Sequence, residues 1–165
     1  MAFSETEQGW RRFIRQLKER GLSGVELATS DAHEGLKQAL QEAFPGLIWQ
    51  RCQSHFRRNV LDQTPSGYRD EMHEVLDQIL EASSQKEART RLDDLREQLE
   101  EKAPSALDTL EDGFYDATAV LALPEKYRKR LRTTNMLERF IQEIRRREKV
   151  IRIFPNMDSA YRLIG

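Results

Sequence analysis

The chain has 165 residues, which suits a single domain and is long enough to bury a hydrophobic core. One third of the residues (33%) are charged and the formal net charge is -1, which is typical of a soluble globular protein. The only cysteine, Cys52, excludes an internal disulfide, and no apolar run reaches the length of a membrane span. We therefore expect a cytoplasmic protein that does not enter a membrane.

The first third of the chain reads as helix, strand, helix, strand. A capping box at residues 4–7 predicts a helix that runs to about Arg20. A helix over residues 34–44 then separates two β-prone runs, at 25–30 and 47–51. Strand, helix and strand in this order predict two parallel strands.

The remainder is helical by pattern. Helices are predicted at 54–61, 68–82 and 86–102, from Pro104 onward, at 135–149, and from Pro155 to the end of the chain. The predicted fold class is therefore α/β and predominantly helical. Two parallel strands alone leave open edges and do not form a stable sheet, so we expect further strands of this sheet outside the sequence.

The two charge types are segregated along the chain. Residues 69–116 hold fifteen acids and six bases, a net charge of -9, whereas residues 123–152 hold eleven bases and four acids, a net charge of +7. A basic block suggests a polyanionic partner, and the acidic block suggests a face turned away from that partner.

Asp31 directly follows the first predicted strand. Open α/β sheets carry their chemistry at the carboxyl ends of their strands, so Asp31 is a candidate metal ligand. Aspartate is also favoured as a helix N-cap, and taken alone Asp31 fits that role better.

Glu138 lies in the basic helix predicted at 135–149. If Asn135 caps this helix, Glu138 stands at the third position and completes a capping box. The surrounding bases favour the charged form of its carboxyl, which suits a metal ligand. An ion pair with Arg139 or Lys129 is the alternative.

Cys52 and His55 directly follow the second predicted strand. A structural zinc site needs four ligands and the chain has no second cysteine, so a packing cysteine and an imidazole near the strand end are favoured over zinc. His33 is predicted to be a surface or supporting residue rather than a ligand.

Basic residues flank Glu138 on both sides. A charged run is often only a solvated face, but this placement favours contact with phosphate groups. The candidate nucleic-acid-binding residues are Lys129, Arg130, Arg132, Arg139, Arg145 and Arg146.

Four segments, in order and spacing, resemble the catalytic domain of Mutator-type bacterial insertion-sequence transposases. They contain Asp31 with His33, Cys52 with His55, Asn135 with Glu138, and the run 153–156. The resemblance covers the chain from about Trp10 to Gly165. It implies a ribonuclease-H-like fold with a helical insertion, which corresponds to residues 52–123, and a DNA transposase activity.

The resemblance also implies an Asp-Asp-Glu site that binds two Mg²⁺ (or Mn²⁺) ions. Asp31 corresponds to the second Asp and Glu138 to the Glu, whereas Cys52 and His55 match a signature of the family. His55 is interpreted as positioning a water or a phosphate. No candidate for the first Asp precedes Val25, so we expect this sequence to be the C-terminal part of the catalytic domain, without its opening strands and the DNA-binding region.

The implied partners are DNA, at the transposon ends and the target, and either a second copy or a full-length transposase. The expected reaction is metal-dependent cleavage and strand transfer, with this truncated chain inactive alone. A non-enzymatic DNA-binding or dimerising fragment that modulates the full-length transposase is the alternative. A decayed remnant without activity is a third.

Overall fold

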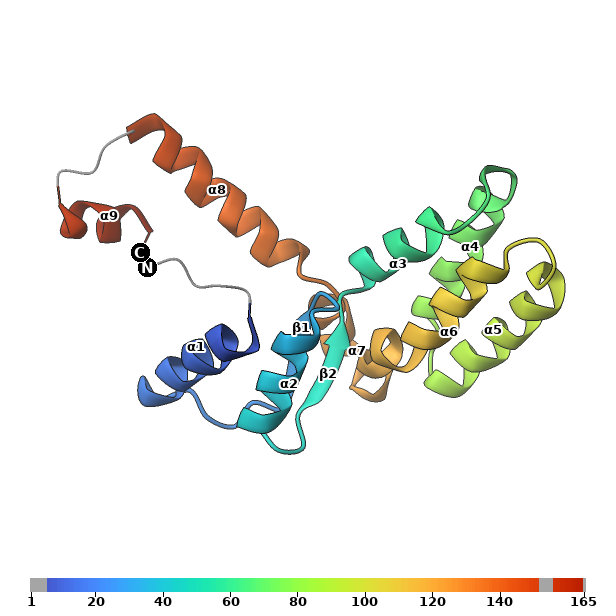
Figure 1. Ribbon diagram of the computed structural model, residues 1–165, viewed down its shortest axis with the longest axis horizontal. Helices are drawn as coiled ribbons and strands as arrows, with labels where there is room; N and C mark the ends of the chain where they lie inside the picture. The colour runs from blue at the N-terminus through green and yellow to red at the C-terminus, as the bar shows by residue number, and fades with distance from the viewer. Residues whose placement is uncertain (1–5, 152–155, 165) are drawn as a thin grey trace. The chain divides into compact units, whose positions relative to one another are not determined.

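The computed structural model describes residues 6–151 and 156–164, which form helices and one small parallel sheet (Figure 1). Contacts divide the chain into two compact units, Met1–Thr133 and Thr134–Gly165, and each is described by itself. The mainly helical α/β class predicted from the sequence is confirmed.

The first unit begins with two packed helices, α1 (Glu7–Glu19) and α2 (Glu34–Ala43). Their small core contains Ile14, Ala39 and Phe44. Thr6 caps α1 by accepting a hydrogen bond from the Gly9 N–H (3.2 Å), so the helix begins later than the predicted capping box, whose Ser4 lies outside the described residues.

The sheet pairs β1 (Leu27–Ser30) with β2 (Ile48–Arg51) in parallel, with Leu27 opposite Ile48 and Ser30 opposite Arg51. The predicted strand–helix–strand unit is thus confirmed. Both strands begin later than predicted because Val25 and Leu47 pack instead against the core between α1 and α2.

A helical region follows the second strand, as predicted. Its elements are α3 (Gln53–Asp62), η1 (Ser66–Tyr68), α4 (Arg69–Leu80), α5 (Gln85–Leu99), α6 (Pro104–Thr118) and η2 (Ala119–Ala122). They enclose the larger core of the unit, in which Phe56, Met72, Leu76 and Leu110 are fully buried.

Gln50, on β2, ties the sheet to this helical region. Its buried side-chain amide donates to the carbonyl of Ala117 (2.8 Å) and accepts from the N–H of Val120 (2.6 Å). Carbonyls in the last turn of a helix have no partner within the helix, so the Gln50 contact satisfies a group at the end of α6. The strand ends are therefore held by a packed helical body.

One helix, α7 (Glu125–Leu131), was not predicted. Its carboxyl end is fixed to the strand ends, because Leu131 O accepts from Thr29 Oγ1 (2.5 Å) and Arg132 O accepts from Gln53 N (2.9 Å). Seven mostly charged residues carry too little apolar periodicity to indicate a helix.

The second unit contains α8 (Asn135–Ile151) and α9 (Met157–Ile164). The sequence suggested Asn135 as the N-cap of this helix. In the structure Asn135 is the first residue of α8, so Thr134 occupies the N-cap position. The predicted start of the last helix at Pro155 lies outside the described residues.

Gly113→Ala should lower the free energy of unfolding by about 1–3 kcal/mol, because a methyl group here would overlap the Phe56 ring and lie 2.5 Å from Arg51 Nη1. Gly→Ala in an exposed helix has the opposite sign and gains about 1 kcal/mol. Urea unfolding measures the change. Gly67→Ala is the control, because a Cβ at Gly67 meets nothing within 4 Å and should shift stability by no more than about 0.5 kcal/mol. A stabilising Gly113→Ala would contradict this packing.

Candidate functional site

Three side chains with metal-binding atoms lie together at the carboxyl edge of the sheet. Asp31 directly follows β1, Cys52 directly follows β2, and His55 lies in the first turn of α3. Because the strands are parallel and in register, the residues after Ser30 and Arg51 emerge at the same edge.

The atoms of this cluster are close to one another. His55 Nδ1 lies 2.7 Å from Asp31 Oδ1 and 3.3 Å from Cys52 Sγ, and all three atoms lie within 4.8 Å of each other. The Asp31 side chain is 56% exposed and that of His55 28%, whereas Cys52 is buried. The site is thus open to solvent on its carboxylate side.

His33, and not Asp31, is the N-cap of α2. Its Nδ1 accepts a hydrogen bond from the Leu36 N–H (3.1 Å). The interpretation of Asp31 as a helix cap is therefore wrong, and its carboxylate remains available for another role.

Hydrogen bonds below the site fix the two strand ends. Ser30 Oγ accepts from Trp49 Nε1 (2.9 Å) and donates to the carbonyl of Asp31 (2.9 Å), while the Cys52 N–H donates to the Ser30 carbonyl (2.7 Å). Asp31 and Cys52 therefore extend from backbone that is held on both strands.

The predicted second acid, Glu138, lies in the first turn of α8 in the other unit. Its Oε1 accepts from Thr134 Oγ1 (2.8 Å), and its N–H donates to Thr134 O (3.0 Å). A carboxylate in the first turn of a helix is stabilised by the helix dipole. The two hydrogen bonds between Thr134 and Glu138 therefore cap the N-terminus of α8.

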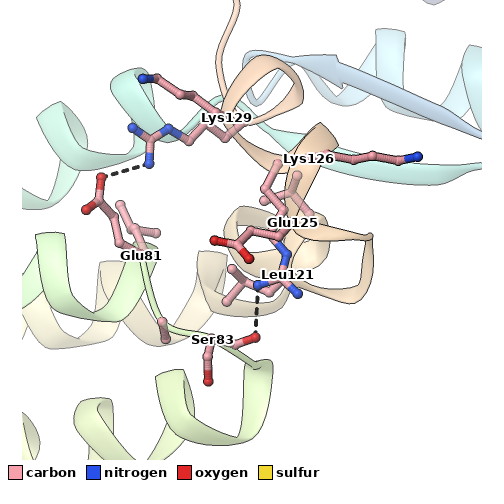
Figure 2. Close-up of a pocket in the computed structure, with 11 residues that line it drawn as sticks. Glu81, Ser83, Leu121, Glu125, Lys126 and Lys129 are labelled. Atoms are coloured by element: carbon pink, nitrogen blue, oxygen red, sulfur yellow. Dashed lines mark hydrogen bonds and ion pairs between the residues drawn. The ribbon is translucent and has the colours of Figure 1, made fainter.

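A cleft of about 920 Å³ lies in the first unit between the α4–α5 turn, η2 and α7 (Figure 2). Cations line one wall. Arg132 forms an ion pair with Glu81 (2.8 Å), whereas Arg128 donates to the carbonyls of Leu123 (2.8 Å) and Ser83 (2.9 Å). These two arginines therefore brace the wall.

Lys126 and Lys129 also line the cleft and are exposed, and neither forms an ion pair with another described residue. Lys129 was predicted to bind nucleic acid, while Lys126 was not among the chosen candidates. The Lys126 ammonium lies over the ring of Tyr127, 4.8 Å from its centroid, so both lysines differ from the two arginines that brace the wall. Arg130, another candidate, is exposed on α7.

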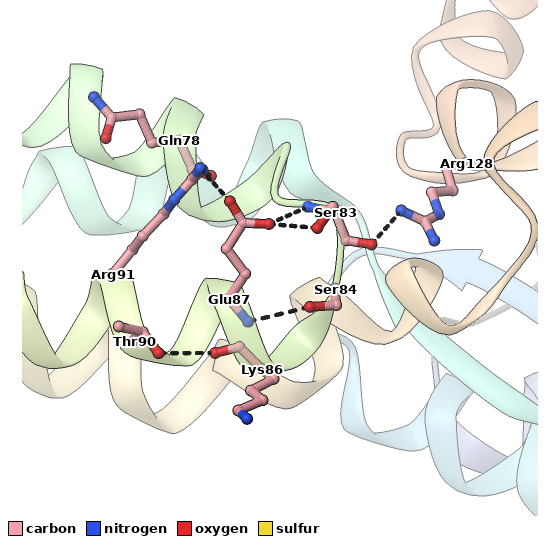
Figure 3. Close-up of polar contacts among 8 residues, drawn as sticks. All are labelled: Gln78, Ser83, Ser84, Lys86, Glu87, Thr90, Arg91 and Arg128. Carbon is pink, nitrogen blue, oxygen red and sulfur yellow. Dashed lines mark hydrogen bonds and ion pairs between the residues drawn. The ribbon is translucent and has the colours of Figure 1, made fainter.

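The opposite wall of the cleft is the α4–α5 turn, which is held by polar contacts (Figure 3). Glu87 accepts from the Ser83 N–H (2.8 Å) and hydroxyl (2.5 Å), and Ser84 caps α5. The hydrogen bonds from Ser83 lower the pKa of Glu87. Since Arg128 donates to the Ser83 carbonyl, this turn and α7 are connected across the cleft.

In the second unit, Arg146 is already paired. Arg146 and Arg147 both bind Glu143, and these hydrogen bonds lower the pKa of Glu143 to about 2. Arg139 and Arg145, the other candidates on α8, are exposed. Three of the six predicted DNA-binding residues therefore lie in each unit. Of the six, Arg132 and Arg146 form ion pairs with described acids.

No helix in the described part of the chain has both the length and the apolar character needed to cross a membrane.

A parallel strand–helix–strand unit with a carboxylate, a thiol and an imidazole at its carboxyl edge defines a helical α/β protein with a polar site at the strand ends. The profile of the family described as "Transposase, Mutator family" matches residues 1–165, and the chain belongs to this family.

Three relatives illustrate the similarity. The chain is 42% identical over 165 residues to the transposase for insertion sequence element IS256 in transposon Tn4001 of Staphylococcus aureus, covering 98% of this chain and 42% of that protein. It is 39% identical to the ISRM5 transposase of Rhizobium meliloti, covering 99% of this chain and 41% of the relative. It is 35% identical to the IS1081 transposase of Mycobacterium tuberculosis, covering 98% of this chain and 39% of the relative. The chain thus spans about two fifths of the length of these relatives.

Proposed function

We propose that this chain is a segment of the catalytic domain of an insertion-sequence transposase, which acts in the cytoplasm, cuts DNA at the ends of the element and joins them to a target. The placement of Asp31 at the carboxyl edge of a parallel sheet, in a chain that matches the family throughout, carries this proposal. The named relatives are transposases of insertion sequences.

A ribonuclease-H-like sheet is part of the proposal. Among the described residues, β1 pairs only with β2, so the outer edge of β1 can accept a further strand. The helices between Cys52 and Leu123 would then be an insertion between this sheet and the segment that carries Glu138. Their buried core supports a compact insertion.

Asp31 and Glu138 are the side chains that we assign to Mg²⁺ or Mn²⁺. The exposed carboxylate of Asp31 fits this role, because both ions prefer oxygen ligands. A pair of such ions, when bound, activates the attacking oxygen and stabilises the leaving one during phosphoryl transfer. His55 Nδ1 lies next to Asp31 Oδ1, so His55 is suited to orient this carboxylate or a water or phosphate beside it.

A chimera tests the proposal. This chain would replace the matching segment of the Staphylococcus aureus relative, and excision of an element with that relative's ends would be measured in cells. Excision is the expected result. A chimera that is stable and binds the end DNA but does not excise the element would contradict the proposal.

A non-enzymatic role is the second candidate: the chain would bind DNA, or dimerise with a full-length transposase, and thereby modulate it. The cleft wall with exposed Lys126 and Lys129 favours it, because such cations suit phosphate contacts.

The chain alone should bind DNA without cutting it. Two carboxylates supply too few ligands for two ions that each take about six. Nicking of a supercoiled plasmid that carries the element ends, in Mg²⁺ or Mn²⁺, measures this, and light scattering reports whether the chain dimerises. Cleavage that disappears with Asp31→Ala would show that the chain is active by itself.

A further inference from the structure

We infer that α7 forms a binding site for an unpaired DNA strand, in which a base stacks on the Tyr127 ring. The phosphates beside that base contact the exposed cations of the same helix, which are Lys126, Lys129 and Arg130. The inference deepens the proposed function and rests on it for the source of the DNA. It uses none of the side chains that we assign to metal binding.

Tyr127 is a large aromatic residue that is 47% exposed, in a helix whose other residues, apart from Leu131, are all charged. A single exposed aromatic residue is common on protein surfaces. Tyr127 differs because the cations around it form no ion pair with another described residue; they are Lys126, Lys129 and Arg130. Aromatic rings among available cations are the means by which proteins hold single strands, since every base has a π face.

The helical repeat places these four side chains on one continuous side of α7. Each residue of a helix is rotated by about 100° from the one before. The order around α7, within an arc of about 160°, is therefore Lys129, Lys126, Arg130 and Tyr127. Lys126 and Lys129 line the cleft, whereas Tyr127 and Arg130 do not. Glu125, the acid of α7, lies outside this arc, so cations extend without interruption from the cleft to the aromatic ring.

The contact between Lys126 and Tyr127 shows that the face of the ring accepts a partner. The Lys126 ammonium lies 4.8 Å from the ring centroid, and its side chain extends away from Leu121 and Glu125 in the cleft (Figure 2). A cation–π contact at an exposed site is weaker than the stacking of a base on an aromatic ring, so a base can replace the ammonium. The displaced ammonium remains within reach of the phosphate of the same nucleotide.

Backbone contacts hold α7 next to the carboxyl edge of the sheet. The Leu131 carbonyl accepts from Thr29 Oγ1 (2.5 Å), and the Arg132 carbonyl accepts from the Gln53 N–H (2.9 Å). Tyr127 precedes Leu131 by one helical turn, which is about 6 Å along the axis. A strand end that is freed by cleavage at this edge can therefore place a neighbouring nucleotide on Tyr127.

Fluorescence anisotropy of the complete chain with a labelled oligothymidylate, and with a duplex of the same length, tests the site. Tyr127→Ala should weaken binding to the single strand about 10-fold and leave duplex affinity unchanged, because only an unpaired base can stack on the ring. The substitution removes no charge, so the salt dependence of binding should stay the same. Tyr115→Ala is the matched control, because Tyr115 is 64% exposed but lies on α6 between Asp112 and Asp116.

Two further variants separate stacking from simple apolar contact. Tyr127→Trp should bind the single strand at least as tightly as the wild type, whereas Tyr127→Leu, which lacks a π face, should resemble Tyr127→Ala. Circular dichroism checks that all variants fold. A single-strand affinity that survives in Tyr127→Ala or Tyr127→Leu would overturn the inference, while duplex binding would leave the proposed DNA-binding role intact. A chain that binds neither DNA would contradict both.

Discussion

Asp31→Asn in the chimera should reduce cleavage at the element ends by on the order of 10³-fold, since a lost metal ligand removes several kcal/mol of transition-state stabilisation. The substitution keeps the size of the side chain and removes its charge. Because Asp31 is exposed and His33 caps α2, the fold should be unaffected. A single-turnover cleavage assay on end DNA in Mg²⁺ measures the rate.

Three further substitutions, which complete two matched pairs, make this result specific. Asp94→Asn removes an exposed carboxylate on α5 and should leave cleavage unchanged. Glu138→Gln should act like Asp31→Asn, whereas Glu148→Gln on the same helix should not. Equal losses in all four variants would point to a general charge effect and against a metal site.

The site at the strand ends could be predicted in part because its signals are local. A β-prone run that ends in Asp31 and a second one that ends before Cys52 indicate parallel strands, and parallel strands bring the following residues to one edge. His55 then joins the cluster by helical spacing. The sequence did not predict that the three side chains would converge on one point, because that depends on the register of the strands.

Two other features, the N-cap of α2 and the burial of Gln50, could not be predicted from the local sequence. Asp31 and His33 can both accept a hydrogen bond from a helix N-terminus, and the structure assigns the cap to His33. Gln50 reads as a polar strand residue, yet it is buried because the end of α6 needs its amide. The role of Gln50 arises from tertiary partners 67 and 70 residues away in the sequence, which periodicity does not report.

The cations beside the cleft at α7 are neighbours in the sequence but differ in their contacts. Arg128 and Arg132 are engaged with Ser83 and Glu81, whereas Lys126 and Lys129 are exposed on the same short helix. If the exposed pair contacts phosphates, its removal should weaken binding to any DNA sequence and reduce the dependence on salt.

Lys126→Ala with Lys129→Ala should therefore lower DNA affinity roughly 30-fold at about 0.15 M salt and reduce the slope of log K against log[salt] by about 2. Fluorescence anisotropy across a salt series measures both quantities. The control, Lys86→Ala with Lys102→Ala, changes the net charge equally but lies in the acidic segment, so its slope should be that of the wild type. Equal effects of both pairs would mean that binding follows net charge alone, whereas a loss confined to the α7 pair would place the DNA backbone along this wall of the cleft.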